Sequence, residues 1–119
     1  MNPQLLAAGA INAAIAVAAG AFGAHALKDR LSDKALAVFE TAARYQMYHA
    51  LAIVLCAAIA GSVAGARLSG WLFTGGIVVF SGSLYALALS DVKILGAITP
   101  LGGLAFLAGW VWLAISALR

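Results

Sequence analysis

Polar side chains recur at helical spacing within an apolar part of this sequence. A helix places residues at positions i, i+4, i+7 and i+8 on one face. Polar residues stand at this spacing in one stretch: Thr41, Tyr45, Tyr48 and His49. Histidine titrates nearest to physiological pH, and an ionisable residue within an apolar span indicates function. The structural alternative is a neutral imidazole that bonds a tyrosine, a serine or a carbonyl and ties helices together.

Metal binding and catalysis have little support in the sequence. Two histidines and a carboxylate are ligands that zinc or iron accepts, but no local pair such as H-x-x-H or E-x-x-H occurs. There is also no G-x-S-x-G, no phosphate-binding loop and no pair of catalytic carboxylates. We therefore predict no catalytic residues, no metal site and no cofactor, and a protein that is not an enzyme.

Four long uncharged runs must position these side chains, and we place the spans at about residues 5–27, 45–66, 68–90 and 96–118. A helix rises about 1.5 Å per residue, so about 20 apolar residues cross a hydrocarbon layer of about 30 Å. The composition agrees, with 65% hydrophobic and 9% charged residues. The chain is therefore predicted to be a single all-α membrane domain, residues 1–119. Short connections favour an antiparallel bundle of four transmembrane helices.

A short amphipathic helix, at about residues 32–44, is expected between the first two spans. Ser32 is a plausible N-cap, and Asp33 suits the dipole of the first turn. Leu36 and Phe39 share one face of this segment, with charged residues opposite. We place the helix at the membrane interface, where it continues with a bend into the second span or stays separate.

The bundle topology brings one end of each span to the same membrane side. Unusual polar residues gather at that end, and they form the candidate polar site: His25, Glu40, Arg44, Tyr45, Gln46, His49, Ser81, Ser83, Tyr85, Thr99 and Pro100. Ser81 and Tyr85 form a polar i, i+4 pair on the third span. The pair Glu40 and Arg44 is either a solvated surface pair or a partly desolvated one.

A second set of residues is predicted to pack helices together, because small side chains allow close approach in lipid and amides bond between helices. These residues are Asn12, Ala16, Gly20, Ala24, Gly61 and Gly65. Packing within one monomer and packing between protomers both remain open. The expected partners are accordingly the lipid bilayer and copies of this chain or other membrane proteins.

Charge distribution gives an orientation and argues against nucleic acid as a partner. The first and third loops carry more Lys and Arg than the second loop and the termini, which predicts that they are cytoplasmic. A net charge of +3 spread over loops is no nucleic-acid footprint. The N-terminal run lacks a preceding Lys or Arg and is longer than a signal h-region, so we expect it to be retained. Trp71, Trp110 and Trp112 are expected to form an aromatic belt on one side.

Four motifs in order resemble a known family. They are residues 20–27 (GAFGAHAL), 41–51 (TAARYQMYHAL), 80–87 (FSGSLYAL) and 96–106 (GAITPLGGLAF), followed by Gly109-Trp110. The chain is similar to the small YgdD/YwdK-like membrane proteins, domain of unknown function 423, over nearly its whole length. The resemblance implies a multi-pass protein of the bacterial inner membrane. It supplies no activity, since the family's biochemical role is not established.

Three functions are compatible with these features. The leading hypothesis is a non-enzymatic scaffold or assembly protein whose small-residue faces pack protomers or other membrane proteins. The alternative is an oligomeric transporter or pore for a small solute or proton, which uses the polar cluster at one membrane face. A third hypothesis treats residues 28–44 as a sensor of anionic lipid.

Overall fold

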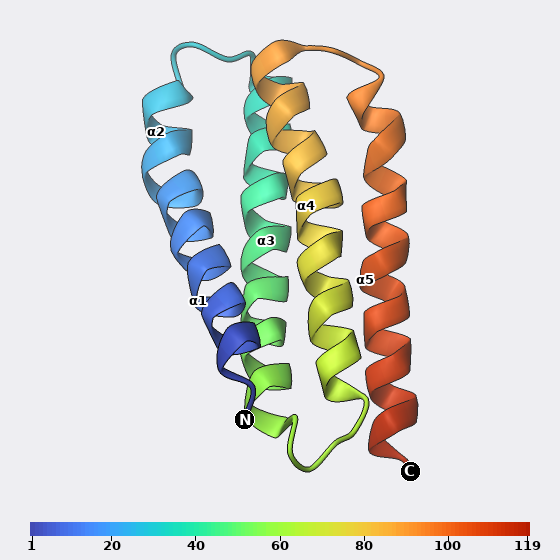
Figure 1. Cartoon of the computed structure of the whole chain (residues 1–119). Helices are drawn as coiled ribbons and strands as arrows, with labels where there is room; N and C mark the ends of the chain where they lie inside the picture. The colour runs from blue at the N-terminus through green and yellow to red at the C-terminus, as the bar shows by residue number, and fades with distance from the viewer.

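The computed structural model describes all residues 1–119 and is entirely helical (Figure 1). The first rod consists of α1 (Pro3–Val17), a π-helical turn η1 (Ala18–Gly23) and α2 (Ala24–Leu27). The other three rods are α3 (Asp33–Ile59), α4 (Ala66–Ser90) and α5 (Leu95–Ala117). The four rods alternate in direction, so the predicted antiparallel bundle of four helices is confirmed.

Each rod is long and apolar enough to cross a bilayer. The four candidate spans contain 25, 27, 25 and 23 residues, with mean hydropathies of 2.0, 1.2, 1.8 and 1.7. At about 1.5 Å per residue, each one exceeds a hydrocarbon layer of about 30 Å. The second span has the lowest hydropathy, and half of its most apolar window is buried inside the bundle. Gln46 and His49 are therefore tolerated in α3 because its neighbours cover them.

Local capping signals explain where the helices begin and end. Asn2 caps α1 through a bond from the Leu5 amide, and Pro3 occupies the first helical position. Ser32 caps α3 by accepting the Ala35 amide proton at 3.1 Å. Asp91 ends α4 in a left-handed conformation with φ of 57°. The N-cap predicted at Ser32 is confirmed.

The helices pack mainly on their chain neighbours, α1 on α3, α3 on α4 and α4 on α5. The main core joins all four helices and is built around large buried side chains: Leu5, Ile53, Cys56, Phe73, Ile77 and Phe106. A smaller cluster of Ala24, Phe39 and Ala88 lies toward the other end of the bundle. The apolar interior therefore consists of two clusters, with buried polar side chains of α3 and α4 between them.

Of the two arrangements expected for residues 32–44, the structure has the one that continues into the second span. Residues 33–44 form the first part of α3, which runs without interruption to Ile59. Phe39 packs between Ala24 and Ala88, so this segment lies inside the bundle and not flat on the membrane surface. The physical reason is that its apolar face finds partners on α2 and α4, which bury it better than an interface would.

One helix boundary differs clearly from the sequence expectation. The connection between α3 and α4 is residues 60–65, earlier than the boundary at 66–68 between the expected spans. Gly61 and Gly65 therefore belong to this turn and do not form a helix-packing stripe. Gly65 still permits a close approach, because a Cβ there would collide with Ser116 of α5. Pro100 lies inside α5.

Candidate functional site

His49 occupies the middle of the bundle with both ring nitrogens bonded. Its side chain is 5% exposed. Nε2 accepts a hydrogen bond from the indole Nε1 of Trp110 at 3.1 Å, and Nδ1 lies 2.8 Å from the carbonyl oxygen of Tyr45. Because an indole only donates and a carbonyl only accepts, the proton is on Nδ1 and the ring is neutral. Neither nitrogen is left free for a metal ion or a proton relay.

Aromatic rings enclose the same imidazole. Phe106 stacks on it with ring centroids 3.5 Å apart and planes within 6° of parallel. Phe73 and Trp110 approach at centroid distances of 5.4 and 5.9 Å. The imidazole therefore joins α3 to α4 and α5 through both stacking and hydrogen bonds.

A chain of amide and phenol groups crosses three helices. Tyr85 of α4 donates to Gln46 Oε1 at 2.8 Å, and Gln46 Nε2 donates to Asn12 Oδ1 of α1 at 3.1 Å. Asn12 Nδ2 in turn bonds the Ala8 carbonyl at 2.9 Å. The interhelical hydrogen bond expected of Asn12 is thus present. Each hydrogen bond in this network has one donor and one acceptor, so no proton has to be shared or moved.

The buried hydroxyl groups also tie helices together. Ser81 donates to the Ala42 carbonyl at 2.8 Å, which links α4 to α3. Ser83 and Thr99 bond each other at 2.5 Å and link α4 to α5. Ser69, which the sequence did not single out, donates to the Gly109 carbonyl at 2.8 Å. The serines of α4 therefore anchor this helix on both of its neighbours.

The side chains of the remaining candidates make no hydrogen bond in these networks. His25 is exposed on α2, and Pro100 is exposed on α5. Glu40 and Arg44 are exposed and make no side-chain hydrogen bond or ion pair. Tyr45 is 37% exposed and packs its ring 5.0 Å from that of Phe80. The structure thus divides the predicted site into a bonded interior group and an exposed group.

No cluster of three His, Cys, Asp or Glu side chains has the geometry of a metal site. His25 stands near the end of α2, and His49 lies within α3. Because Ala24 packs beside Phe39, the two histidines are separated by about 15 Å along the bundle.

Trp110, Phe73 and Phe106 contribute to the site although the sequence did not mark them as site residues. Trp110 was assigned to an aromatic belt, yet its indole N–H points to His49. The two residues are 61 positions apart in the chain. Only the register between α3 and α5 brings them together, and no local spacing reveals it.

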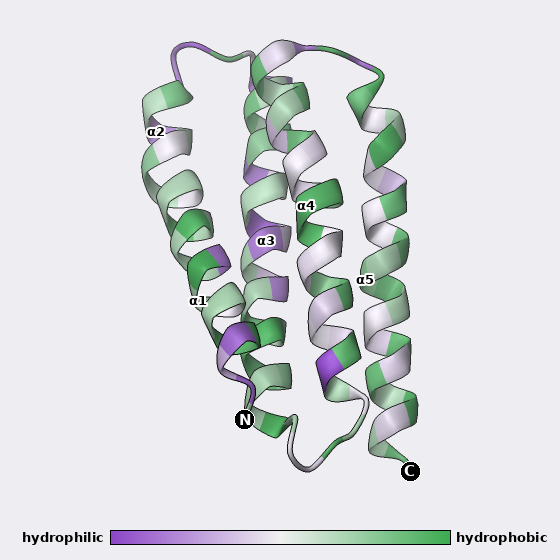
Figure 2. Ribbon diagram, viewed as in Figure 1, coloured by the Kyte–Doolittle hydropathy of each residue, from purple (hydrophilic) through white to green (hydrophobic).

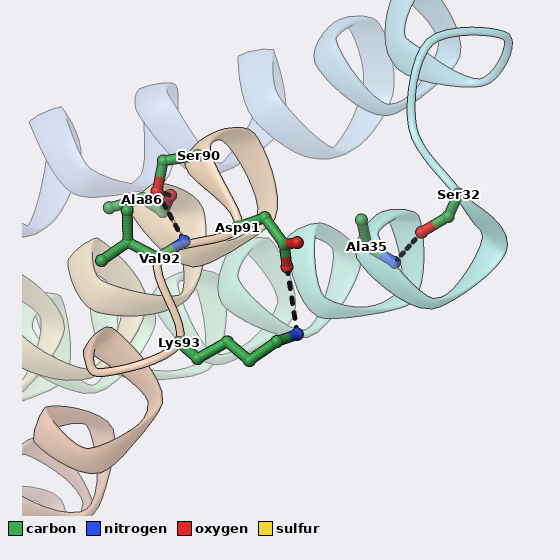
Figure 3. A network of polar contacts seen from close by, with 7 residues as sticks. All are labelled: Ser32, Ala35, Ala86, Ser90, Asp91, Val92 and Lys93. Carbon is green, nitrogen blue, oxygen red and sulfur yellow. Dashed lines mark hydrogen bonds and ion pairs between the residues drawn. The ribbon is translucent and has the colours of Figure 1, made fainter.

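The end of the bundle that carries the α2–α3 and α4–α5 loops has a separate surface network of hydrogen bonds (Figure 3). Lys93 Nζ lies 3.5 Å from Asp91 Oδ1, and both side chains are more than four-fifths exposed. Ser90 donates to the Ala86 carbonyl and accepts from the Val92 amide. Exposed pairs of this kind contribute little to stability. This network fixes the turn after α4 and forms no site.

Comparison with known proteins identifies the family. The family model "Protein of unknown function (DUF423)" matches residues 19–103. A UPF0382 membrane protein of Staphylococcus epidermidis is 53% identical over 112 residues, covering 93% of this chain and 92% of its own length. UPF0382 membrane protein YwdK of Bacillus subtilis is 48% identical over 114 residues, covering 93% of each. No solved structure matches. Together with the four apolar helices, these matches confirm the predicted resemblance: the chain is a multi-pass membrane protein that belongs to the DUF423 family.

Proposed function

We propose that this protein is a non-enzymatic membrane scaffold, which presents a rigid helical surface to protein partners in the bilayer. The observation that carries the proposal is the saturated bonding of His49, whose two ring nitrogens both serve the bundle. Gln46, Tyr85, Ser81, Ser83 and Thr99 are engaged in the same way. In hydrocarbon such bonds between helices hold a packing arrangement. The names of the cited relatives describe membrane proteins and no enzyme.

Replacing His49 by alanine tests this proposal. The variant loses two hydrogen bonds and the stacking on Phe106, so its free energy of unfolding should fall by about 2–4 kcal/mol. Unfolding in detergent, followed by circular dichroism, measures the change. His25→Ala is the matched control, because His25 is exposed and unbonded, and it should change stability by less than about 0.5 kcal/mol. A fully stable His49→Ala variant that has lost a transport activity would instead identify a transporter.

One observation favours that second candidate, an oligomeric transporter or pore. A surface crevice of about 450 Å³ reaches Tyr45, His49 and Pro100 between α3 and α5. It opens on the outside of the bundle, so conduction requires further subunits to close a path. Proteoliposomes that contain the purified protein and stay tight to protons, ions and small metabolites would exclude this candidate.

We place the protein in the bacterial plasma (inner) membrane with the α2–α3 and α4–α5 loops in the cytoplasm. Lys28, Arg30 and Lys93 lie in those loops and Lys34 lies in the first turn of α3, against Arg67 and Arg119 at the opposite end. Arg44 is left out of this count because it lies about three helical turns into α3, away from the loop.

Single cysteines introduced into a Cys56→Ala background test the orientation. A membrane-impermeant maleimide applied to whole cells should label Ala64→Cys in the α3–α4 turn and leave Asp29→Cys unlabelled until the cells are broken. Labelling of Asp29→Cys in intact cells would reverse the orientation. Both positions are exposed in connections between helices, so reactivity differs only through the compartment.

A further inference from the structure

Arg44 lies close to the middle of the membrane-spanning bundle. Arg67 and Asp91, at the two ends of α4, are separated by about 36 Å along the helix. Ser81 of α4 bonds the Ala42 carbonyl of α3, which fixes the register of these antiparallel helices. The midpoint of α4 is residue 78, which lies three residues from Ser81 toward Arg67. Because α3 runs in the opposite direction, this midpoint is level with residue 45 of α3. Arg44 is therefore within about 2 Å of the bundle's centre along its axis. Glu40 lies about 6 Å nearer the end that carries the α2–α3 and α4–α5 loops.

These two charges face outward at a depth where lipid cannot solvate them. Both side chains are exposed, and the one ion pair of the chain joins Lys93 and Asp91. Figure 2 shows hydrophilic residues along the middle of α3, between α1 and α4, which are mostly hydrophobic. The nearest interface is about 15 Å from the middle of the hydrocarbon, beyond the reach of an arginine side chain. A charged group left there is expensive unless a partner neutralises it.

The surface around the charges is a groove into which another helix fits. The groove has a volume of about 470 Å³ and runs between the first rod and α3. Its walls include Ala16, Gly20 and Ala21 on one side and Glu40, Arg44 and Tyr48 on the other. Small residues on one wall let a neighbouring backbone come close, which is how helices associate in lipid.

We propose that this groove is a homodimer interface, in which Arg44 of each copy pairs with Glu40 of the partner subunit. Two copies inserted in the same direction and related by a two-fold axis along the membrane normal present the same residues at the same depth. Arg44 and Glu40 are one helical turn apart on α3. Each arginine side chain therefore extends toward the α2–α3 loop, where it meets the carboxylate of Glu40 of the partner subunit. The opposite charges make the surface complementary to itself. Phospholipid headgroups lie at the interface and acyl chains carry no charge, so neither supplies these counter-charges at mid-membrane depth.

This proposal deepens the scaffold function and rests on it, and charge exchange tests it. Glu40→Arg and Arg44→Glu each place like charges across the interface, so the dissociation constant of the dimer should rise by at least about tenfold. The double variant restores opposite charges and should recover the dimer. Lys34→Glu is the matched control. It reverses an exposed charge at the start of the same helix, away from the groove, and should leave the dimer unchanged. Native mass spectrometry of the full chain in mild detergent measures all of these species.

Cross-linking covers the case in which a charge variant fails to insert. In a Cys56→Ala background with the native charges, Tyr48→Cys should form an oxidised dimer in membranes, because Tyr48 lines the groove. Val78→Cys on α4, which is 70% exposed, should not. Any one of four results would overturn the interface. They are a monomeric wild-type protein, a dimer insensitive to both charge reversals, a monomer that carries bound phospholipid in the groove, and cross-linking through residue 78 alone. None of these results would alter the scaffold assignment, which is tested independently at His49.

Discussion

Replacing Gly102 by alanine is expected to be among the most destabilising single-methyl changes in this chain. A Cβ at this position would lie 2.7 Å from the Cα of Phe80 and closer still to the Phe80 backbone nitrogen. Backbone atoms cannot rotate away, so α4 and α5 must separate. That separation strains the bonds from Ser83 to Thr99 and from Ser69 to the Gly109 carbonyl. We expect a loss of about 3 kcal/mol, at the upper end of overpacking effects.

Gly75→Ala provides the control for the Gly102 experiment. Gly75 lies within α4, and a Cβ there meets nothing within 4 Å. Alanine is the better helix former, so this variant should be as stable as the wild type or up to about 1 kcal/mol more stable. Chemical unfolding in detergent micelles, followed by circular dichroism, measures both variants. Equal effects at the two positions would mean that α4 and α5 do not approach closely at Gly102.

The four spans could be predicted from the sequence because membrane insertion depends on local properties. Runs of apolar residues and short polar connections determine the number and direction of the helices. Whether residues 33–44 form a separate helix could not be predicted in the same way. The charges of residues 33–44 suit a membrane surface, but the burial of Phe39 against Ala24 and Ala88 depends on helices distant in sequence. Tertiary packing therefore outweighed the local charge pattern.

The interior site was only partly accessible to sequence reasoning. His49, Gln46 and Tyr85 could be selected because polar groups in apolar spans need partners. Their actual partners depend on rotation and register, which a single sequence does not encode locally. Trp110 illustrates the difficulty, since a tryptophan near a span end is typical of the membrane interface. Its indole instead serves His49.

Gln46 holds the most connected position among these polar residues, and Gln46→Leu is also expected to have a large effect. The substitution removes the bonds from Tyr85 and to Asn12 while keeping a similar side-chain volume. It leaves the Tyr85 hydroxyl and Asn12 Oδ1 without partners in an apolar interior. Interhelical bonds in membranes are individually worth about 0.6–2 kcal/mol. We expect the free energy of unfolding to fall by about 1–3 kcal/mol. The same chemical unfolding in detergent micelles, followed by circular dichroism, measures this change.

A double-mutant cycle with Tyr85→Phe separates the hydrogen-bond network from simple packing. Tyr85→Phe removes one donor and keeps the ring that packs edge-on against Phe39 with centroids 5.0 Å apart. If the phenol acts through Gln46, the double variant should be less destabilised than the sum of the single variants, with a coupling of at least about 0.5 kcal/mol. Additive effects would show that the two side chains contribute independently. Coupling together with unchanged proton permeability would mean that this line of polar groups across α1, α3 and α4 serves to align helices, as a scaffold requires.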